Sequence, residues 1–339
     1  MSSSSLGETP HTGIATFAGH RGVGGRAWIG GGAGAAAWLA VSLLTALWPD
    51  KPDSDWEYTQ NLAILFAAIG AGAAVTAVAG LRWTVPERIR HTVPWLLALA
   101  ILIAAWEMVT AKLGLLPMPF FPPPQAILEV MIDDWKRLLE GVVASLKLLA
   151  GGYLIGAAVG FVVGVAIGWS RPIGYWIHPI LRVVGPLPAT AWLPLAFFIF
   201  PSSLSASTFL IALATGFPVA VLTWSGVAGV STGYYDVART LGASRWFLVA
   251  QVAIPAALPH VFVGLFMGLG NSFAVLVVAE MLGVKAGLGW YLQWAQGWAA
   301  YANMYAALFI MALVCSGLIT LLFRLRDRLL SWQKGLVRW

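Results

Sequence analysis

The sequence predicts an all-α membrane protein with about eight transmembrane helices. Of its 339 residues, 59% are hydrophobic and only 10% are charged, whereas soluble domains carry about 25% charged residues. Apolar stretches of about 20 residues, long enough to cross a bilayer, recur along the chain. An open sheet in lipid would leave backbone groups without hydrogen-bond partners, so helices are the expected spanning element.

Eight apolar stretches qualify as spans. The fifth is the least regular, because Pro186, Pro188 and Pro194 interrupt it. The spans are expected at about 27–48, 60–81, 93–112, 143–169, 183–200, 205–230, 258–282 and 300–323.

The basic residues predict the orientation of these spans. If both termini are cytoplasmic, most of the 20 lysines and arginines fall in inner segments, as the positive-inside rule requires. Asp50, Asp53, Asp55 and Glu57 crowd the first outer loop. The net charge of +6 therefore reflects how the chain is oriented in the lipid membrane. We expect no nucleic-acid partner.

Four segments are predicted along the chain. Residues 1–26 are rich in Ser, Gly and Thr and lack an apolar core, which is typical of a disordered cytoplasmic tail. Residues 27–92 form an extra two-helix hairpin, for which packing or assembly is the expected role. Residues 93–330 hold the other six spans, and residues 331–339 form a cytoplasmic C-terminal tail.

Five glycines in the fourth span follow one another at intervals of four residues. Residues four apart lie on nearly one face of a helix, so these glycines make a smooth stripe that another helix can approach closely. That helix can belong to the same subunit or to a second copy. The stripe comprises Gly152, Gly156, Gly160, Gly164 and Gly168.

A polar island lies between the sixth and seventh spans, over residues 234–247. Its pattern predicts a short amphipathic helix over 235–244, with apolar side chains on one side and charged ones elsewhere. Gly242 lies six residues after Asp236, and a glycine there permits a backbone turn or a close approach. The apolar exit from the island contains Leu258-Pro259.

The order of Asp236, Ala238, Gly242-Ala243 and Leu258-Pro259 resembles the cytoplasmic coupling loop of ABC importer permeases of the nitrate/sulfonate/taurine type. The resemblance covers residues 93–330 and implies a type I importer (MetI-like) permease core. The family pattern opens most often with Glu-Ala-Ala, where this chain has Asp236-Val237-Ala238. By resemblance, the residues that couple to the ATPase are Tyr235, Asp236, Ala238, Arg239, Leu241, Gly242, Ala243 and Ser244.

Two more blocks carry the resemblance, residues 185–195 and 278–290. Repeated prolines at membrane depth break a helix, and broken helices line transport pathways; a kinked packing helix is the alternative. A polar pair within a span bonds a neighbouring helix or lines the path. A charged residue within a span either has a functional role, forms a structural ion pair or lies at the end of a helix. The candidate pathway residues are Pro188, Trp192, Asn271, Ser272 and Glu280.

The resemblance also implies the partners. Two ATPase subunits would bind ATP and Mg²⁺, a second permease subunit is expected to be the same chain, and an extracytoplasmic binding protein would deliver the solute. The expected solute is a small anion such as a sulfonate, taurine, nitrate, bicarbonate or an aromatic acid, imported across the bacterial inner membrane by alternating access. The chain itself is expected to be no enzyme, since it has no Walker A motif, and to hold no cofactor or metal.

Two other classes of protein compete with this interpretation. An ion-coupled secondary transporter would use Glu107 or Glu280 as a proton carrier, and predicts an internal repeat with broken helices in both halves. Proline disruption occurs only around 186–194, and this alternative leaves the polar island unexplained. A membrane-embedded enzyme would need a paired nucleophile and base, or clustered His and carboxylates, and the spans contain no such cluster.

Overall fold

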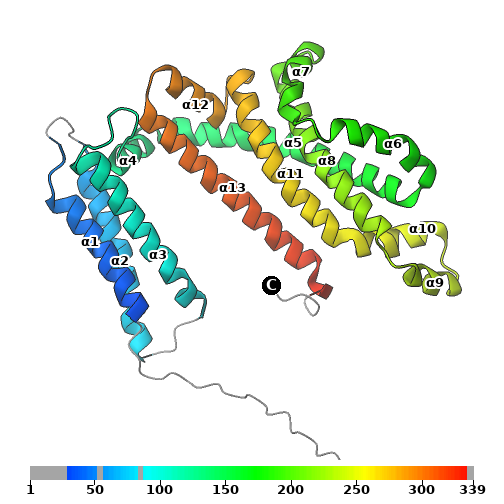
Figure 1. Cartoon of the computed structure of the whole chain (residues 1–339), viewed down its shortest axis with the longest axis horizontal. Coiled ribbons are helices and arrows are strands. Elements are labelled where there is room, and N and C mark those ends of the chain that lie inside the picture. Colours follow the sequence, from blue (N-terminus) through cyan, green and yellow to red (C-terminus); the bar gives the residue numbers. More distant parts are fainter. Residues whose placement is uncertain (1–28, 52–55, 83–86, 334–339) are drawn as a thin grey trace, which may run out of the picture. The chain divides into compact units, whose positions relative to one another are not determined.

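The computed structural model describes residues 29–51, 56–82 and 87–333, and over these residues it is helical with no strand (Figure 1). The predicted all-α fold is confirmed. Seven of the described helices are long and apolar enough to cross a membrane, and an eighth crossing results if one bent pair counts as a single span. The predicted tail at 1–26 and most of the one at 331–339 lie outside the described residues.

The chain divides into two compact units, of which the first holds α1 (Ile29–Leu47), α2 (Thr59–Arg82) and α3 (Glu87–Glu107) as far as Ala105. Trp38 of α1 joins the three helices. Its Nε1 donates to the carbonyl oxygen of Leu96 in α3 at 3.1 Å, and its ring lies 5.5 Å from that of Phe66 in α2. The predicted two-helix hairpin is therefore part of a three-helix unit, and the units divide after residue 105 rather than after 92.

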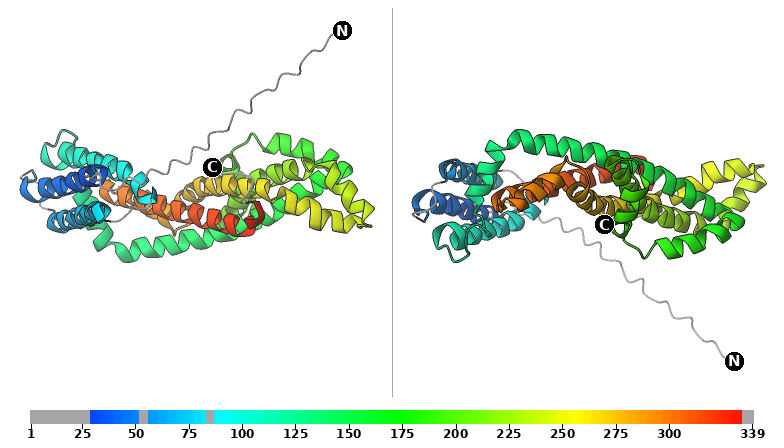
Figure 2. Two further views of the ribbon diagram at one scale, coloured as in Figure 1. Left: turned by 90° about the horizontal axis from the view of Figure 1, so that it is seen from below. Right: turned by 90° about the horizontal axis from the view of Figure 1, so that it is seen from above.

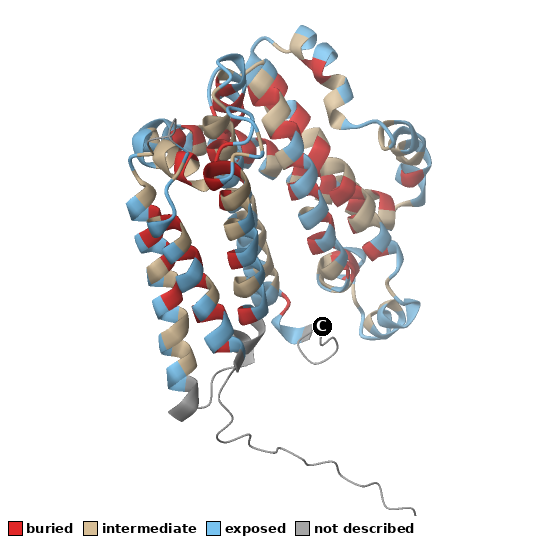
Figure 3. Cartoon of the chain, turned by 60° about the vertical axis from the view of Figure 1, so that its left-hand side comes forward, coloured by how far each residue is buried: buried red, intermediate tan, exposed pale blue. Residues whose placement is uncertain are grey.

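The second unit comprises the 49–59 loop and the chain from Trp106 onward. Its long helices are packed with α8 between α5 and α11 (Figure 2). Exposed positions recur along every long helix, as expected for helices in lipid (Figure 3). Its elements are η1 (Met108–Lys112), α4 (Pro124–Asp133), α5 (Trp135–Trp169), α6 (Arg171–Val184), η2 (Ala189–Trp192), α7 (Leu193–Ile199), α8 (Ser203–Ala228), α9 (Thr232–Thr240), α10 (Arg245–Phe247), η3 (Leu248–Ala253), α11 (Ile254–Leu282), α12 (Leu288–Gly297), α13 (Tyr301–Leu329) and η4 (Ser331–Gln333).

A buried ionic cluster ties the 49–59 loop to the rest of the second unit. The Nζ of Lys112 lies 2.9 Å from Oδ1 of Asp50 and 3.5 Å from Oε1 of Glu107, and the lysine and glutamate side chains are fully buried. Gln125 at the start of α4 donates from Nε2 to Oε1 of Glu107 at 2.8 Å. Glu107 is thus held in a network of buried groups, which is a structural role for one of the two intramembrane glutamates.

The five glycines of α5 all face α8. A methyl group on Gly156 would overlap the carbonyl oxygen of Ala212, and one on Gly160 would overlap that of Gly216. Successive glycines meet successive turns of α8, down to Gly168 beside Val227, so the two helices run in the same direction. The stripe therefore serves packing within the subunit, which answers the question that the sequence left open.

The fifth predicted span, 183–200, is not one helix. The chain leaves α6 at Val184, forms the 3₁₀ turn η2 and continues as the short α7, with the two parts bent by 88°. Pro186 and Pro188 lie at this break, and Pro194 lies in the first turn of α7. A proline lacks the backbone N–H and disfavours α conformation in the residue before it, so a continuous helix cannot form through this segment.

Candidate functional site

The polar island folds as a short exposed helix, α9, followed by a tight turn. The predicted helix over 235–244 was misplaced: α9 begins at Thr232 and ends at Thr240. Gly242 follows with φ +81°, and a methyl group built there would meet nothing within 4 Å. Within the chain this glycine serves a backbone turn, which is one of the two roles that the sequence had left open.

The turn after α9 has the hydrogen bonds of a Schellman motif. The amide of Gly242 donates to the carbonyl of Arg239 at 2.9 Å, and the amide of Ala243 donates to that of Ala238 at 3.0 Å. Ser244 then begins α10, since its Oγ accepts from the amide of Phe247 at 3.3 Å. The local sequence thus fixes where α9 ends and where the chain re-enters the helices that lead to α11.

One side of α9 is anchored to the long helices through Tyr235. Its ring lies 5.9 Å from that of Trp169 at the end of α5. It also packs against a buried cluster of Val227 from the end of α8, Ala253 from η3 and Ala257 from the start of α11. Burial raises the pKa of Tyr235, and the charge of Arg239 acts in the opposite direction. A displacement of α9 would therefore be felt by three long helices at once.

The other side of α9 presents apolar side chains to solvent. Tyr234, Val237 and Leu241 are 65%, 64% and 83% exposed. Their spacing of three and four residues places them along one face. Asp236 and Arg239 form an exposed pair with Oδ1 and Nη1 3.3 Å apart, and such a pair contributes little stability. Exposed apolar groups in a row are typical of a docking surface.

A cavity of about 260 Å³ lies between the end of α6, the break with η2, α8 and α11. Pro188 and Asn271 both line it, so two of the five candidate pathway residues meet there. Thr190 and Pro218 contribute to the same wall. Asn271 is exposed and makes no hydrogen bond among the described residues.

The other three candidate pathway residues lie outside the wall of that cavity. Trp192 packs against the main core cluster of the second unit. Ser272 is fully buried, and its hydroxyl donates to the carbonyl of Leu269 at 3.0 Å in its own helix. Glu280 is 1% exposed, and its Oε2 accepts from the amide of Gly289 at 2.8 Å. Glu280 thus has the geometry of a cap on the first turn of α12.

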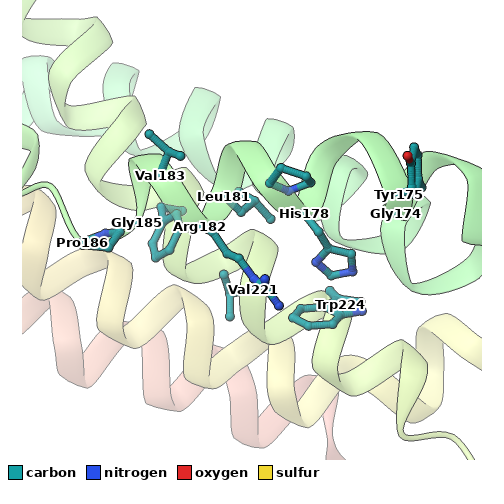
Figure 4. A pocket seen from close by; sticks show the side chains of 12 residues that line it. Gly174, Tyr175, His178, Leu181, Arg182, Val183, Gly185, Pro186, Val221 and Trp224 are labelled. Carbon is teal, nitrogen blue, oxygen red and sulfur yellow. The ribbon is translucent and has the colours of Figure 1, made fainter.

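A larger cavity of about 1020 Å³ lies between α6 and α8 (Figure 4). His178 and Arg182 of α6 and Trp224 of α8 line it, and the rings of His178 and Trp224 are 4.2 Å apart. The sequence did not single out these residues, because Arg182 is one of the basic residues that the positive-inside rule already explains. Their spacing of four residues on one helix was the available signal. Among the residues that the structure describes, no group of three His, Cys, Asp or Glu could hold a metal ion.

Comparison with known proteins adds to this geometry. The nitrate import permease protein NrtB of Synechococcus elongatus is 28% identical over 75% of this chain and 93% of its own length. The putative aliphatic sulfonates transport permease protein SsuC of Bacillus subtilis is 29% identical over 71% of this chain and 87% of its own length. The bicarbonate transport system permease protein CmpB of Synechococcus elongatus is 33% identical over 60% of this chain and 70% of its own length.

A family match covers the segments just described. Residues 152–334 match the family of the "Binding-protein-dependent transport system inner membrane component". The matched region takes in the glycine stripe, the broken span, α9 and α11 through α13, and it is more than half of the chain. The protein is therefore a multi-pass inner-membrane permease that belongs to the binding-protein-dependent transport family.

Proposed function

We propose that the chain is the permease of an ATP-driven ABC importer, which carries a small anion into the cytoplasm by alternating access. The observation that carries this proposal is the exposed α9, anchored through Tyr235 to the ends of α5, α8 and α11. A partner ATPase that moves α9 on binding ATP would tilt these three helices together. The ATP and Mg²⁺ would be bound by that partner, because this chain has no Walker A motif.

The exposed apolar face of α9 supports a docking role for it. Val237 and Leu241 protrude into solvent next to the turn at Gly242. Burying two such side chains in a groove would contribute about 1.5–3 kcal/mol each. Of the coupling residues proposed from the sequence, Tyr235, Asp236, Ala238 and Arg239 lie in α9, and Leu241, Gly242, Ala243 and Ser244 form the turn that follows it. In this arrangement α9 and both termini face the cytoplasm, in agreement with the distribution of basic residues.

The names of the relatives support a small anion as the solute. The three relatives are described as permeases for nitrate, aliphatic sulfonates and bicarbonate, and all of these solutes are small anions. Delivery by an extracytoplasmic binding protein follows from the family description. We infer that the binding protein selects among anions and that the permease supplies a pathway of modest affinity.

The exposure of Asn271 supports a second permease subunit, which we propose is the same chain. The amide lies midway along α11 and has no hydrogen-bond partner among the described residues. In hydrocarbon an unpaired amide costs several kcal/mol. A water-filled pathway shared by two copies would hydrate it, with Pro188 on the same wall. Two ATPase subunits would then engage the two α9 helices.

The test is co-purification of the tagged chain from its native membranes, with partners identified by mass spectrometry and uptake measured in proteoliposomes. The informative variant is Val237→Asp, which puts a charge in the exposed apolar face. The matched control is Thr232→Asp, since it adds the same charge to an exposed position at the first residue of the same helix, where an acidic group is favoured.

We expect the unmodified chain and the Thr232→Asp variant to retain an ATPase subunit and a second copy of the chain. Val237→Asp should be inserted normally but lose the ATPase. Uptake of nitrate or methanesulfonate should require ATP and the binding protein. Recovery of the chain without any ATPase, together with uptake driven by an ion gradient alone, would overturn the proposal in favour of a secondary transporter.

A further inference from the structure

We propose that Arg182 and His178 bind the anionic group of the transported solute in the cavity between α6 and α8. This inference rests on the proposed function and names a binding step that neither the family match nor the relatives assign. The cavity, of about 1020 Å³, is large enough for a small hydrated anion. It lies toward the end of α8 that leads to α9, which is the cytoplasmic end in the proposed orientation.

The two side chains share one face of α6. They are four residues apart, and both line the cavity, where they extend toward α8 (Figure 4). Trp224 of α8 lies beside them, with its ring 4.2 Å from that of His178 in an edge arrangement. A guanidinium with its planar fork of donors matches the geometry of an oxyanion such as nitrate, a carboxylate or a sulfonate.

The charge balance of the cavity favours an anion. Arg182 forms no ion pair among the described residues, and no carboxylate is among the described residues of the cavity wall. Arg182 is exposed, and if α6 and α7 together make one crossing, a guanidinium there is costly unless it meets water or an opposite charge. Because the cavity wall offers Arg182 no carboxylate, an anion from outside the chain can pair with its guanidinium.

The cavity also continues the predicted pathway. Gly185 and Phe217 line both this cavity and the smaller one that contains Pro188 and Asn271. The ring of Phe217 packs against Gly185 so closely that a methyl group on this glycine would overlap it. Phe217 thus lies at the boundary between the two cavities, and an anion that passes it moves from the amide of Asn271 to the guanidinium of Arg182.

The alternative source of an anion is the phosphate of a lipid headgroup, so the experiment has to separate the two. Cys315 is the single cysteine of the chain, and its replacement by alanine gives a background in which Val221→Cys places one thiol in the cavity wall. The full chain in phosphatidylcholine nanodiscs is then treated with methanethiosulfonate reagents of equal length that carry a sulfonate or a quaternary ammonium group. Ser331→Cys, at an exposed position, serves as the reference thiol.

Relative to the reference thiol, we expect the sulfonate reagent to modify Val221→Cys on the order of tenfold faster than the ammonium reagent. Arg182→Gln should abolish the preference, and Arg182→Lys should retain most of it. Nitrate or methanesulfonate at millimolar concentration should slow the sulfonate reagent in the parent chain but not in Arg182→Gln. His178→Gln should weaken this protection while retaining part of the preference.

Three results would overturn the inference. The first is a charge preference that Arg182→Gln leaves unchanged. The second is a thiol that neither reagent reaches, which would mean that the cavity is filled by protein or lipid. The third is protection by added phosphatidylglycerol but not by free anions, which would assign the site to a lipid phosphate. This experiment measures thiol modification and not import. Failure of the anion site can therefore be distinguished from failure of the proposed function, which co-purification of the ATPase tests separately.

Discussion

The amide of Gly289 lies 2.8 Å from Oε2 of Glu280, so a side chain near the end of α11 caps the first turn of α12. The preceding amide, that of Leu288, donates to Oγ of Ser145 in α5 at 2.9 Å. Two of the amides that every helix start leaves unpaired are therefore satisfied by two different long helices. Gly287 makes this possible, because its φ of +101° is accessible to glycine and a side chain there would overlap the Glu280 carboxylate.

This arrangement predicts that Glu280→Ala destabilises the protein by about 1–3 kcal/mol, the cost of a buried amide without a partner. Glu280→Gln keeps an oxygen that can accept from Gly289, so we expect it to retain both stability and uptake. Thermal unfolding in detergent and uptake in proteoliposomes measure the two effects. A Glu280→Gln variant that folds as the parent does but no longer transports would instead identify Glu280 as a proton carrier.

The sequence was sufficient to predict the helical fold and most spans, because each depends on local composition. It also located Gly242 and the glycine stripe of α5. It left open whether Gly242 serves a turn or a close approach, and whether the stripe packs within one subunit or between two copies. It was not sufficient for the role of Glu280, whose partner Gly289 lies in the next helix. Nor could it bring Arg182 and Trp224 to one cavity, because that depends on how α6 leaves the proline break.

The close approach of α5 and α8 predicts that Gly160→Ala destabilises the protein. The added methyl group would overlap the carbonyl oxygen of Gly216, and overpacking of this kind costs about 1–3 kcal/mol. Gly151→Ala is the matched control, since a methyl group there meets nothing within 4 Å and alanine favours a helix by about 1 kcal/mol over glycine. Equal melting temperatures for the two variants would contradict the packing.

The carboxyl of Glu129 in α4 predicts a pH dependence of stability. Burial, followed by the charges of Asp133 and Glu57, raises its pKa above the ordinary 4.5. The folded state therefore holds this proton more tightly than the unfolded state, and stability falls as the pH rises from about 4.5 through the folded pKa. Glu129→Gln should remove this loss, so the variant gains stability over the parent at neutral pH but not below pH 4.

Unfolding midpoints across pH 4–8 measure this difference. The exposed Glu140 provides the control for the removal of a surface carboxylate, and a difference that Glu140→Gln also shows would not be assigned to Glu129. A Glu129→Gln variant that is less stable than the parent at neutral pH would show that the carboxylate stabilises the fold in its charged form, and would contradict the direction of the shift.

The turn after α9 predicts that a substitution at Gly242 can reduce coupling to the ATPase while the protein still folds. Its φ of +81° disfavours residues with a side chain, yet there is open space around it. Gly242→Val should therefore cost only about 1–2 kcal/mol and leave insertion intact. By shifting the turn, it should displace Leu241 from the docking face and reduce co-purification of the ATPase and ATP-dependent uptake. Asparagine adopts positive φ more readily than other residues with side chains, so Gly242→Asn is the control expected to keep both. Full uptake by Gly242→Val would show that the turn does not position α9 for its partner, and the coupling role would have to move to other inner loops.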